Sequence, residues 1–198
     1  SGEEPRVAEY IRTELLSDLG DDDETFLLRA SILEVVEPAV AEAVTGMDGA
    51  AERLRSLARD NRLVVRLAGG APSYRFHHVL GEYLRAELDR REPGSTQELH
   101  RRAAAWFERA DRVELAIEHA LAGADQATAA RLVVAITLPM HYAGHTDVLD
   151  RWIRAFDETT FERLPPLAVV GALVNGLTGR AEAAERLARW GWQENAYR

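Results

Sequence analysis

The chain has 198 residues, enough for one large domain or two small ones with apolar cores. It contains no Cys, and all 24 residues of its Lys and Arg count are Arg, which excludes disulfides, thiolate metal sites and every mechanism that needs a Lys amine. The net charge is −9 and neither half is basic, so direct nucleic-acid binding, which needs clustered cations, is disfavoured. We therefore expect partners to be proteins or neutral ligands.

No apolar run approaches the length of about 20 residues that spans a bilayer, and no signal segment opens the chain. We expect a cytoplasmic protein with no membrane partner. Because the chain begins with Ser1-Gly2 and not with Met, we also expect it to be part of a longer protein.

The spacing of apolar side chains predicts four helices before the first strand. The first covers residues 7–15, and Asp21–Asp23 supply capping carboxylates for the second. Pro38 begins the third helix and Gly46 ends it, because proline suits a first turn and glycine a helix end. Asp48 is placed to cap the fourth.

A period of two then replaces the helical period and predicts a small hairpin. Leu63, Val65 and Leu67 share one face of the first strand. Tyr74 and Phe76 share one face of the second, after a turn rich in glycine and proline.

A helix resumes at Val79 and ends before Pro93, and Ser95 is placed to cap the next helix. Several helices, a two-stranded wing and a closing helix together predict a winged-helix-like domain over residues 1–91.

From residue 92 to residue 198 the pattern is purely helical. Short amphipathic helices are separated by turns at Gly123–Asp125 and Thr178–Arg180, and alanine-rich second helices permit close packing. This pattern is typical of a tetratricopeptide-like helical-repeat array. The predicted fold is therefore mostly α: a winged-helix-like module with a small β-hairpin, followed by helical repeats that continue in the longer protein.

Histidines are the only candidates for chemistry. His77 stands at a strand end just before a helix, where an imidazole could donate to a phosphate; a packing or capping role is the alternative. His141 and His145 have the spacing of a zinc pair, but Gly144 lies between them and no third ligand is evident, which favours an ordinary surface pair. His100 and His119 are interpreted as packing residues. No catalytic residue and no metal ligand is predicted.

Four segments occur in the same order as similar segments of a known family: FLLRASIL at 26–33, YRFHHVLGEYLR at 74–85, LHRRAAAWF at 99–107 and AIEHAL at 116–121. Together they resemble the MalT-like regulators of the LuxR family over about residues 6–135. The resemblance implies a signal-transducing P-loop ATPase of the STAND type. In such proteins a nucleotide-binding domain precedes the winged helix, and a helical-repeat sensor and a DNA-binding helix-turn-helix follow it.

The resemblance also implies a role for His77, which corresponds to a histidine that senses ADP through its phosphates. Related sensors often have Asp after this histidine, where this chain has His78. ATP or ADP is then expected as a cofactor of the full-length protein, with no cofactor held by this chain alone. The expected partners are the upstream nucleotide-binding domain, an inducer or regulatory protein on the repeats, and further copies of the chain.

The leading hypothesis is a non-catalytic sensor segment that couples nucleotide state to ligand or partner binding. Two alternatives stay open on the sequence. One is a DNA-binding winged helix with a helical dimerisation arm, which the acidic charge disfavours. The other is a plain helical-repeat scaffold for protein interactions, with no link to a nucleotide.

Overall fold

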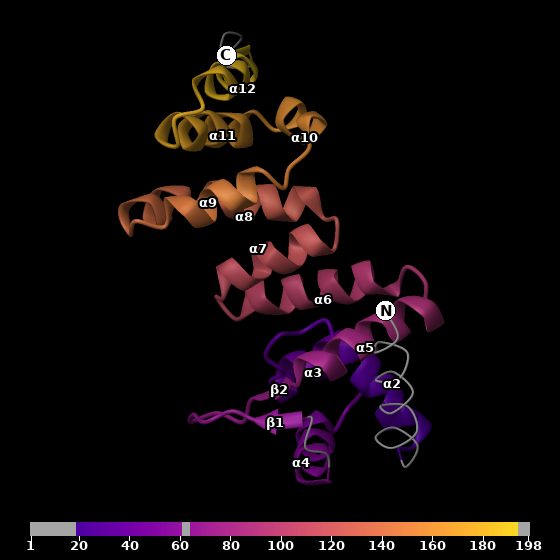
Figure 1. Cartoon of the computed structure of the whole chain (residues 1–198). Coiled ribbons are helices and arrows are strands. Elements are labelled where there is room, and N and C mark those ends of the chain that lie inside the picture. Colours follow the sequence, from indigo (N-terminus) through magenta and orange to yellow (C-terminus); the bar gives the residue numbers. More distant parts are fainter. Residues whose placement is uncertain (1–18, 61–63, 194–198) are drawn as a thin grey trace. The chain divides into compact units, whose positions relative to one another are not determined.

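The computed structural model describes residues 19–60 and 64–193, and the helix predicted at residues 7–15 lies outside them. The described chain is mostly helical with one two-stranded antiparallel sheet, which confirms the predicted fold class (Figure 1). It divides into two units, residues 1–106 and 107–198. This division falls within helix α6, and the domain boundary that we expect after residue 91 stays a prediction.

Five helices and a hairpin form the described part of the first unit. They are α2 (Asp21–Ala30), α3 (Pro38–Thr45), α4 (Ala50–Asp60), β1 (Val64–Arg66), β2 (Tyr74–Phe76), α5 (His78–Arg91) and α6 (Ser95–Arg109). Large side chains from α2, α4 and α5 are fully buried and form the core: Phe26, Leu27, Leu54, Leu80, Leu84 and Leu88. Burying each such side chain stabilises the fold by about 1.5–3 kcal/mol.

The ends of α2 and α3 follow local backbone chemistry. Helix α3 starts at Pro38, and Gly46 closes it with a φ of 71°, as predicted. The caps predicted for α2 were wrong in detail, because Gly20 is the N-cap and Asp21–Asp23 lie inside the first turn. There the carboxylates stabilise the helix through its dipole.

Two further capping predictions are wrong. Helix α4 begins at Ala50, and the amides of Gly49 and Ala50 donate to Glu42 Oε1 of α3 at 3.1 and 3.0 Å, so the carboxylate comes from Glu42 and not from Asp48. The hydroxyl of Ser95 is buried without a hydrogen-bond partner and caps nothing. In both cases a residue of the right type stands near a helix start, but tertiary packing decides which oxygen reaches the amides.

The hairpin is confirmed, but its first strand faces the other way. Val64 is buried and Val65 is 48% exposed, so the predicted inward face of β1 was wrong by one residue. Val64 pairs with Phe76 and Val65 with Arg75, and paired residues share one face of a sheet. The buried Phe76 therefore brings Val64 inward.

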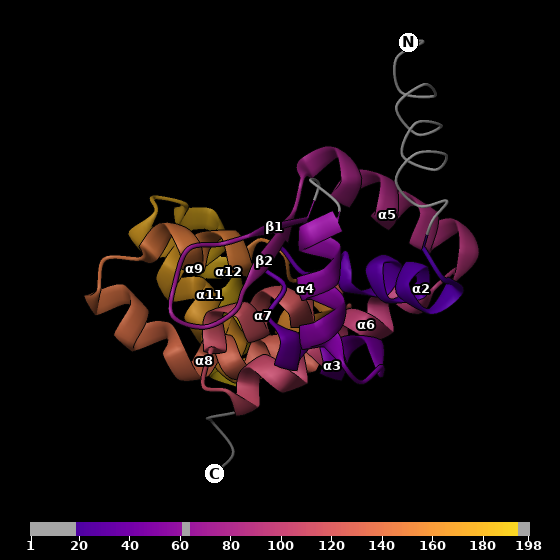
Figure 2. The ribbon, with the colours of Figure 1, turned by 90° about the horizontal axis from the view of Figure 1, so that it is seen from below.

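A short bridge also joins the hairpin to the chain before α3. Val36 and Tyr74 exchange two backbone hydrogen bonds of 2.8 and 3.0 Å, and both side chains are buried. This anchors β2 on its second edge, while the loop between the strands projects away from the helices of this unit (Figures 1 and 2).

An ion cluster ties α5 to α2. Glu87 accepts hydrogen bonds from Arg90 at 2.6 and 2.8 Å and from Arg91 at 2.5 Å, and Arg91 also donates to Glu24 of α2 at 2.8 Å. The hydrogen bonds from Arg90, with those from Arg91, outweigh the effect of burial and lower the pKa of Glu87 from 4.5 to about 2. The negative charge of Glu87 is thus stabilised in the folded chain.

The second unit contains α7 (Val113–Ala122), α8 (Gln126–Tyr142), α9 (Thr146–Ile153), α10 (Glu158–Arg163), α11 (Pro165–Leu177) and α12 (Ala181–Gln193). Neighbours in the chain pack together as α7 with α8, α8 with α9 and α11 with α12, while α11 also contacts α8 and α9 (Figure 1). This arrangement is consistent with a helical-repeat array. No helix in the described ranges combines the length and apolar character needed to cross a membrane.

One turn geometry recurs in these helices and closes α6, α7, α8 and α11. The residue after the C-cap has a positive φ, at Asp111, Ala124, Gly144 and Gly179. Its amide donates to the carbonyl three residues back, and the next amide donates to the carbonyl five residues back, as Gly179 does to Gly176 at 3.2 Å and Arg180 does to Asn175 at 2.9 Å. This is a Schellman motif, and it confirms both turns predicted at residues 123–125 and 178–180.

We predict that Glu87→Gln lowers the free energy of unfolding at pH 7 by about 1–2 kcal/mol, allowing for solvent screening. A carboxylate with a lowered pKa stabilises the fold above pH 4.5 and loses this contribution as the pH falls toward 2. The difference between variant and parent should therefore shrink over that window in urea unfolding. A constant difference across it, or an equal effect of Glu98→Gln, whose side chain on α6 is 53% exposed, would contradict the assignment.

We predict that Ala124→Gly stabilises the chain by about 0.5–1 kcal/mol, because alanine is strained in the left-handed region and glycine is not. The reverse change at the equivalent position, Gly179→Ala, should destabilise by about 1 kcal/mol. A Cβ at Gly179 meets no atom within 4 Å, so only backbone strain is tested. Thermal unfolding of the two variants should give shifts of opposite sign.

Candidate functional site

His77 lies where the sequence places it, between strand β2 and helix α5. It is the N-cap of α5, with φ −55° and ψ 140°, and its side chain makes no capping hydrogen bond. The rings of His77 and His78 are 4.3 Å apart, and both residues are exposed. His77 therefore stands immediately before the first amides of a 14-residue helix.

This corner suits an anion. Helix α5 has no acidic residue in its first turn, and the positive end of its dipole coincides with the two imidazoles. Nearby Arg75 is exposed and lies 3.4 Å from Glu34. The residues present thus fit a phosphate group, which His77 could hold by donating a hydrogen bond. Contact between His77 and a nucleotide stays a prediction.

The other histidines do not form a site. His141 Nδ1 lies 3.3 Å from Thr146 Oγ1, and His145 is the N-cap of α9. Among the described residues no three His, Asp or Glu side chains gather where they could hold a metal ion. His119 stacks on Phe107 with 5.2 Å between ring centroids, which confirms its packing role. Burial lowers the pKa of His100, so this side chain favours its neutral form.

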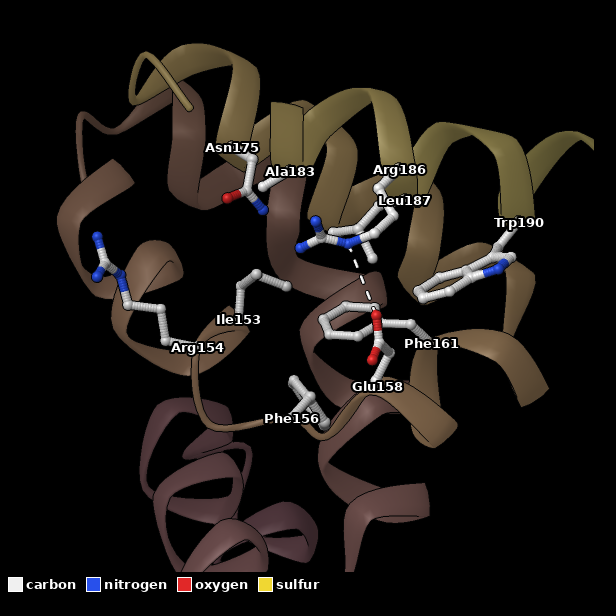
Figure 3. Close-up of a pocket in the computed structure, with 10 residues that line it drawn as sticks. All are labelled: Ile153, Arg154, Phe156, Glu158, Phe161, Asn175, Ala183, Arg186, Leu187 and Trp190. Atoms are coloured by element: carbon white, nitrogen blue, oxygen red, sulfur yellow. Dashed lines mark ion pairs between the residues drawn. The ribbon is translucent and has the colours of Figure 1, made fainter. Parts of the chain in front are cut away.

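The second unit contains a pocket that the sequence did not predict. Its volume is about 290 Å³, and it lies among α9, α10, α11 and α12 with the segment after α9 (Figure 3). Ten residues line it: Ile153, Arg154, Phe156, Glu158, Phe161, Asn175, Ala183, Arg186, Leu187 and Trp190. Aromatic and aliphatic side chains form its floor, and charged groups stand at its rim.

Buried and half-buried polar groups fix one side of the pocket. Asp150 accepts hydrogen bonds from Arg180 and, at 3.0 Å, from Arg154. Arg180 Nε donates to Asn175 Oδ1 at 2.7 Å, and Asn175 Nδ2 donates to the Gly171 carbonyl at 2.7 Å. The hydrogen bond from Arg180, aided by Arg154, lowers the pKa of Asp150 and keeps it ionised. These groups satisfy one another and thereby hold α9, α11 and the start of α12 in place.

The opposite side depends on close packing at Gly171. A Cβ there would lie 2.8 Å from Leu187 Cδ1 and 2.9 Å from Phe161 Cε1. Both contacts are shorter than side chains tolerate, so the absence of a side chain lets α10 and α12 approach α11. Phe161 and Phe156 then meet edge to face at 6.0 Å on the pocket floor.

The sequence predicts a binding role for none of the pocket residues. They come from separate helices, and each alone is ordinary: an exposed Glu or Arg on a polar face, or an aromatic in an apolar stripe. The one available signal is Gly171 inside a strongly apolar helix, since a glycine there often marks a close approach of another element.

We predict that Gly171→Ala destabilises the chain by about 1–3 kcal/mol through overpacking against Phe161 and Leu187. Gly176 lies on the same helix, and a Cβ there meets no atom within 4 Å. Gly176→Ala, in the last turn of α11, should therefore stabilise, by at most the difference of about 0.5–1 kcal/mol between Gly and Ala in a helix interior. Equal effects of the two changes in chemical denaturation would show that Gly171 is not closely packed.

The fold of the first unit agrees with comparisons to known proteins. A family described as the MalT winged helix domain matches residues 12–96. The chain is 30% identical over 165 residues to the HTH-type transcriptional regulator MalT of Vibrio cholerae, covering 83% of this chain and 18% of that protein. It is 26% identical over 188 residues to the MalT of Yersinia enterocolitica, covering 90% of this chain and 21% of that protein.

A relative of another kind also matches. The chain is 31% identical over 133 residues to the serine/threonine-protein kinase PknK of Mycobacterium tuberculosis, covering 67% of this chain and 12% of that protein. The chain spans about a fifth or less of the length of these relatives. Three observations agree: the family match, the MalT relatives over most of the chain, and the observed helices with their hairpin. The chain belongs to the MalT-like regulators, whose winged helix domain it carries at residues 12–96.

Proposed function

We propose that this chain is a non-catalytic regulatory segment of an ATP-dependent, MalT-like transcriptional regulator. It couples the nucleotide state of an upstream ATPase domain to the binding of a ligand or partner on its helical repeats. The observation that carries the proposal is the length of the Vibrio cholerae match. Its 165 residues cannot fit within residues 12–96, so the similarity includes both the winged helix and the helices that follow.

The kinase relative supports the same proposal. Its match of 133 residues is also longer than the winged helix domain. A segment shared by proteins named as a transcriptional regulator and as a protein kinase does not by itself determine either output. What such proteins can share is the part that receives a signal, which favours a regulatory role over a catalytic one.

The two candidate sites divide this role between the two units. In the first unit, the corner at His77 and the start of α5 would contact an ADP phosphate held by the upstream domain. In the second, the pocket floored by Phe156 and Phe161 would take the inducer. A ligand shifts such an equilibrium only if it binds one state more tightly than the other, so the inducer must favour the state in which the His77 contact is released.

The proposal extends to the longer protein. It includes a LuxR-type DNA-binding domain outside this chain, a tetratricopeptide-like character for the second unit, self-association through the repeats and a cytoplasmic location.

We predict that His77→Ala in the full-length regulator weakens ADP binding about tenfold, the effect of losing one charge-assisted hydrogen bond to a phosphate. Calorimetry with ADP measures this directly. His145→Ala is the matched control, because His145 is also an exposed N-cap histidine without a side-chain capping bond. Unchanged ADP affinity in His77→Ala, or binding of ADP by the present chain alone, would contradict the proposed role.

A further inference from the structure

The rim of the pocket carries two opposite charges that are loosely paired. Arg186 Nε lies 3.6 Å from Glu158 Oε1, which is longer than a hydrogen bond, and the two side chains are 59% and 66% exposed (Figure 3). An exposed ion pair of this kind contributes little to stability. A ligand that offers better-placed charges can therefore replace it at low cost.

The floor directly beneath this pair is apolar. Phe156, Phe161 and Leu187 are buried, with exposed fractions of 6–7%, and Trp190 forms a half-buried wall. Figure 3 shows Phe156 and Phe161 on the side of the pocket that carries Glu158. A ligand seated here places an apolar body on the aromatic floor and its charged groups at the rim.

Two further polar side chains of the pocket already have hydrogen-bond partners. Arg154 donates to Asp150 at 3.0 Å, and both amide atoms of Asn175 are hydrogen bonded, to Arg180 and to Gly171. This leaves Glu158 and Arg186 as the groups best able to recognise a charged ligand.

A ligand with only one charge suits this rim poorly. An anion would pair with Arg186 but would lie close to the carboxylate of Glu158, and a cation would meet the reverse problem. A zwitterion satisfies both groups at once, because its carboxylate accepts hydrogen bonds from Arg186 while its ammonium donates to Glu158. The volume of about 290 Å³ lies at the lower end of the range for ligand pockets, which restricts the ligand to a small molecule.

We infer that this pocket binds a free α-amino acid with an apolar or aromatic side chain. The inference deepens the proposed function by naming the chemical class of the inducer, and it rests on that function only for its regulatory meaning. The amino acid carboxylate pairs with Arg186, the ammonium pairs with Glu158, and the side chain packs against Phe161 and Trp190.

The test is titration of the purified chain with L-phenylalanine, followed by calorimetry and by tryptophan fluorescence, since Trp190 lines the pocket. We expect saturable binding that Glu158→Gln and Arg186→Gln each weaken about tenfold, as expected for loss of one charge-assisted contact. Phenethylamine, which lacks the carboxylate, and 3-phenylpropionate, which lacks the ammonium, should bind at least tenfold more weakly than L-phenylalanine.

The matched control is the Glu118 and Arg151 pair of the same unit, which is similarly exposed and lies outside the pocket lining, with a separation of 2.7 Å. Glu118→Gln and Arg151→Gln should leave binding unchanged, and all four variants should keep the thermal unfolding of the parent within a few degrees. Absence of saturable binding at 10 mM, on the order of the weakest specific ligands, would overturn the inference. Equal affinity for the singly charged analogues, or equal loss in the control variants, would also overturn it.

This experiment separates the two proposals. Binding that depends on Glu158 and Arg186 supports the pocket assignment even if ADP affinity of the full-length regulator is indifferent to His77. Loss of ADP affinity in His77→Ala supports the regulatory proposal even if no amino acid binds.

Discussion

The second unit depends on how its helices end. A Schellman motif ends each of α7, α8 and α11, and a three-residue connection follows. Each connection requires one residue in the left-handed region, which is strained unless that residue is glycine. Because the connection is so short, the following helix must return alongside the one before it. Repetition of this constraint aligns α8 with α7, α9 with α8 and α12 with α11. The pocket is a consequence, since α9 and α12 approach α11 from different directions and leave space between them.

The uneven distribution of charge among these helices follows from the same arrangement. Helices α8 and α11, which contact each other, contain Arg131 as their one Asp, Glu, Arg or Lys residue. Helices α9, α10 and α12, with Arg154 just after α9 and Arg180 just before α12, carry the acids and arginines of the pocket rim and its network. Apolar side chains thus dominate α8 and α11, and the pocket lies where the charged helices α9, α10 and α12 meet α11.

Sequence periodicity predicted the hairpin and the longer described helices because each must bury one face, and that requirement is local. It did not predict α10, whose six residues are too few to show a helical period. It failed where two local solutions were equivalent. Valine stands at both 64 and 65, so the strand alternation fits either register, and only the pairing of Val64 with the buried Phe76 decides between them. The prediction of a capping residue failed at α4, where the amide of Ala50 donates to Glu42 Oε1, eight residues earlier in the chain.

The candidate sites differ in the same respect. His77 could be located from the sequence because its neighbours in the chain create its surroundings: a strand end on one side and a helix start on the other. The pocket could not, because its opposing charges come from Glu158 on α10 and Arg186 on α12, which only the packing around Gly171 brings together. Sites built by one turn are visible in a sequence, and sites built by several helices require the fold.

The charges of the first unit bear on how the winged helix acts. Several of its arginines lie against acids of the same unit: Arg29 against Glu92, Arg75 against Glu34, and Arg91 against both Glu24 and Glu87. A DNA reader needs cations presented to phosphates, because neutralising them supplies much of the affinity. A cation already paired with a carboxylate gains less from a phosphate, and the carboxylate beside it repels one. Together with the net charge of −9, this pairing favours a winged helix that docks on protein, with its anion-compatible corner limited to the start of α5.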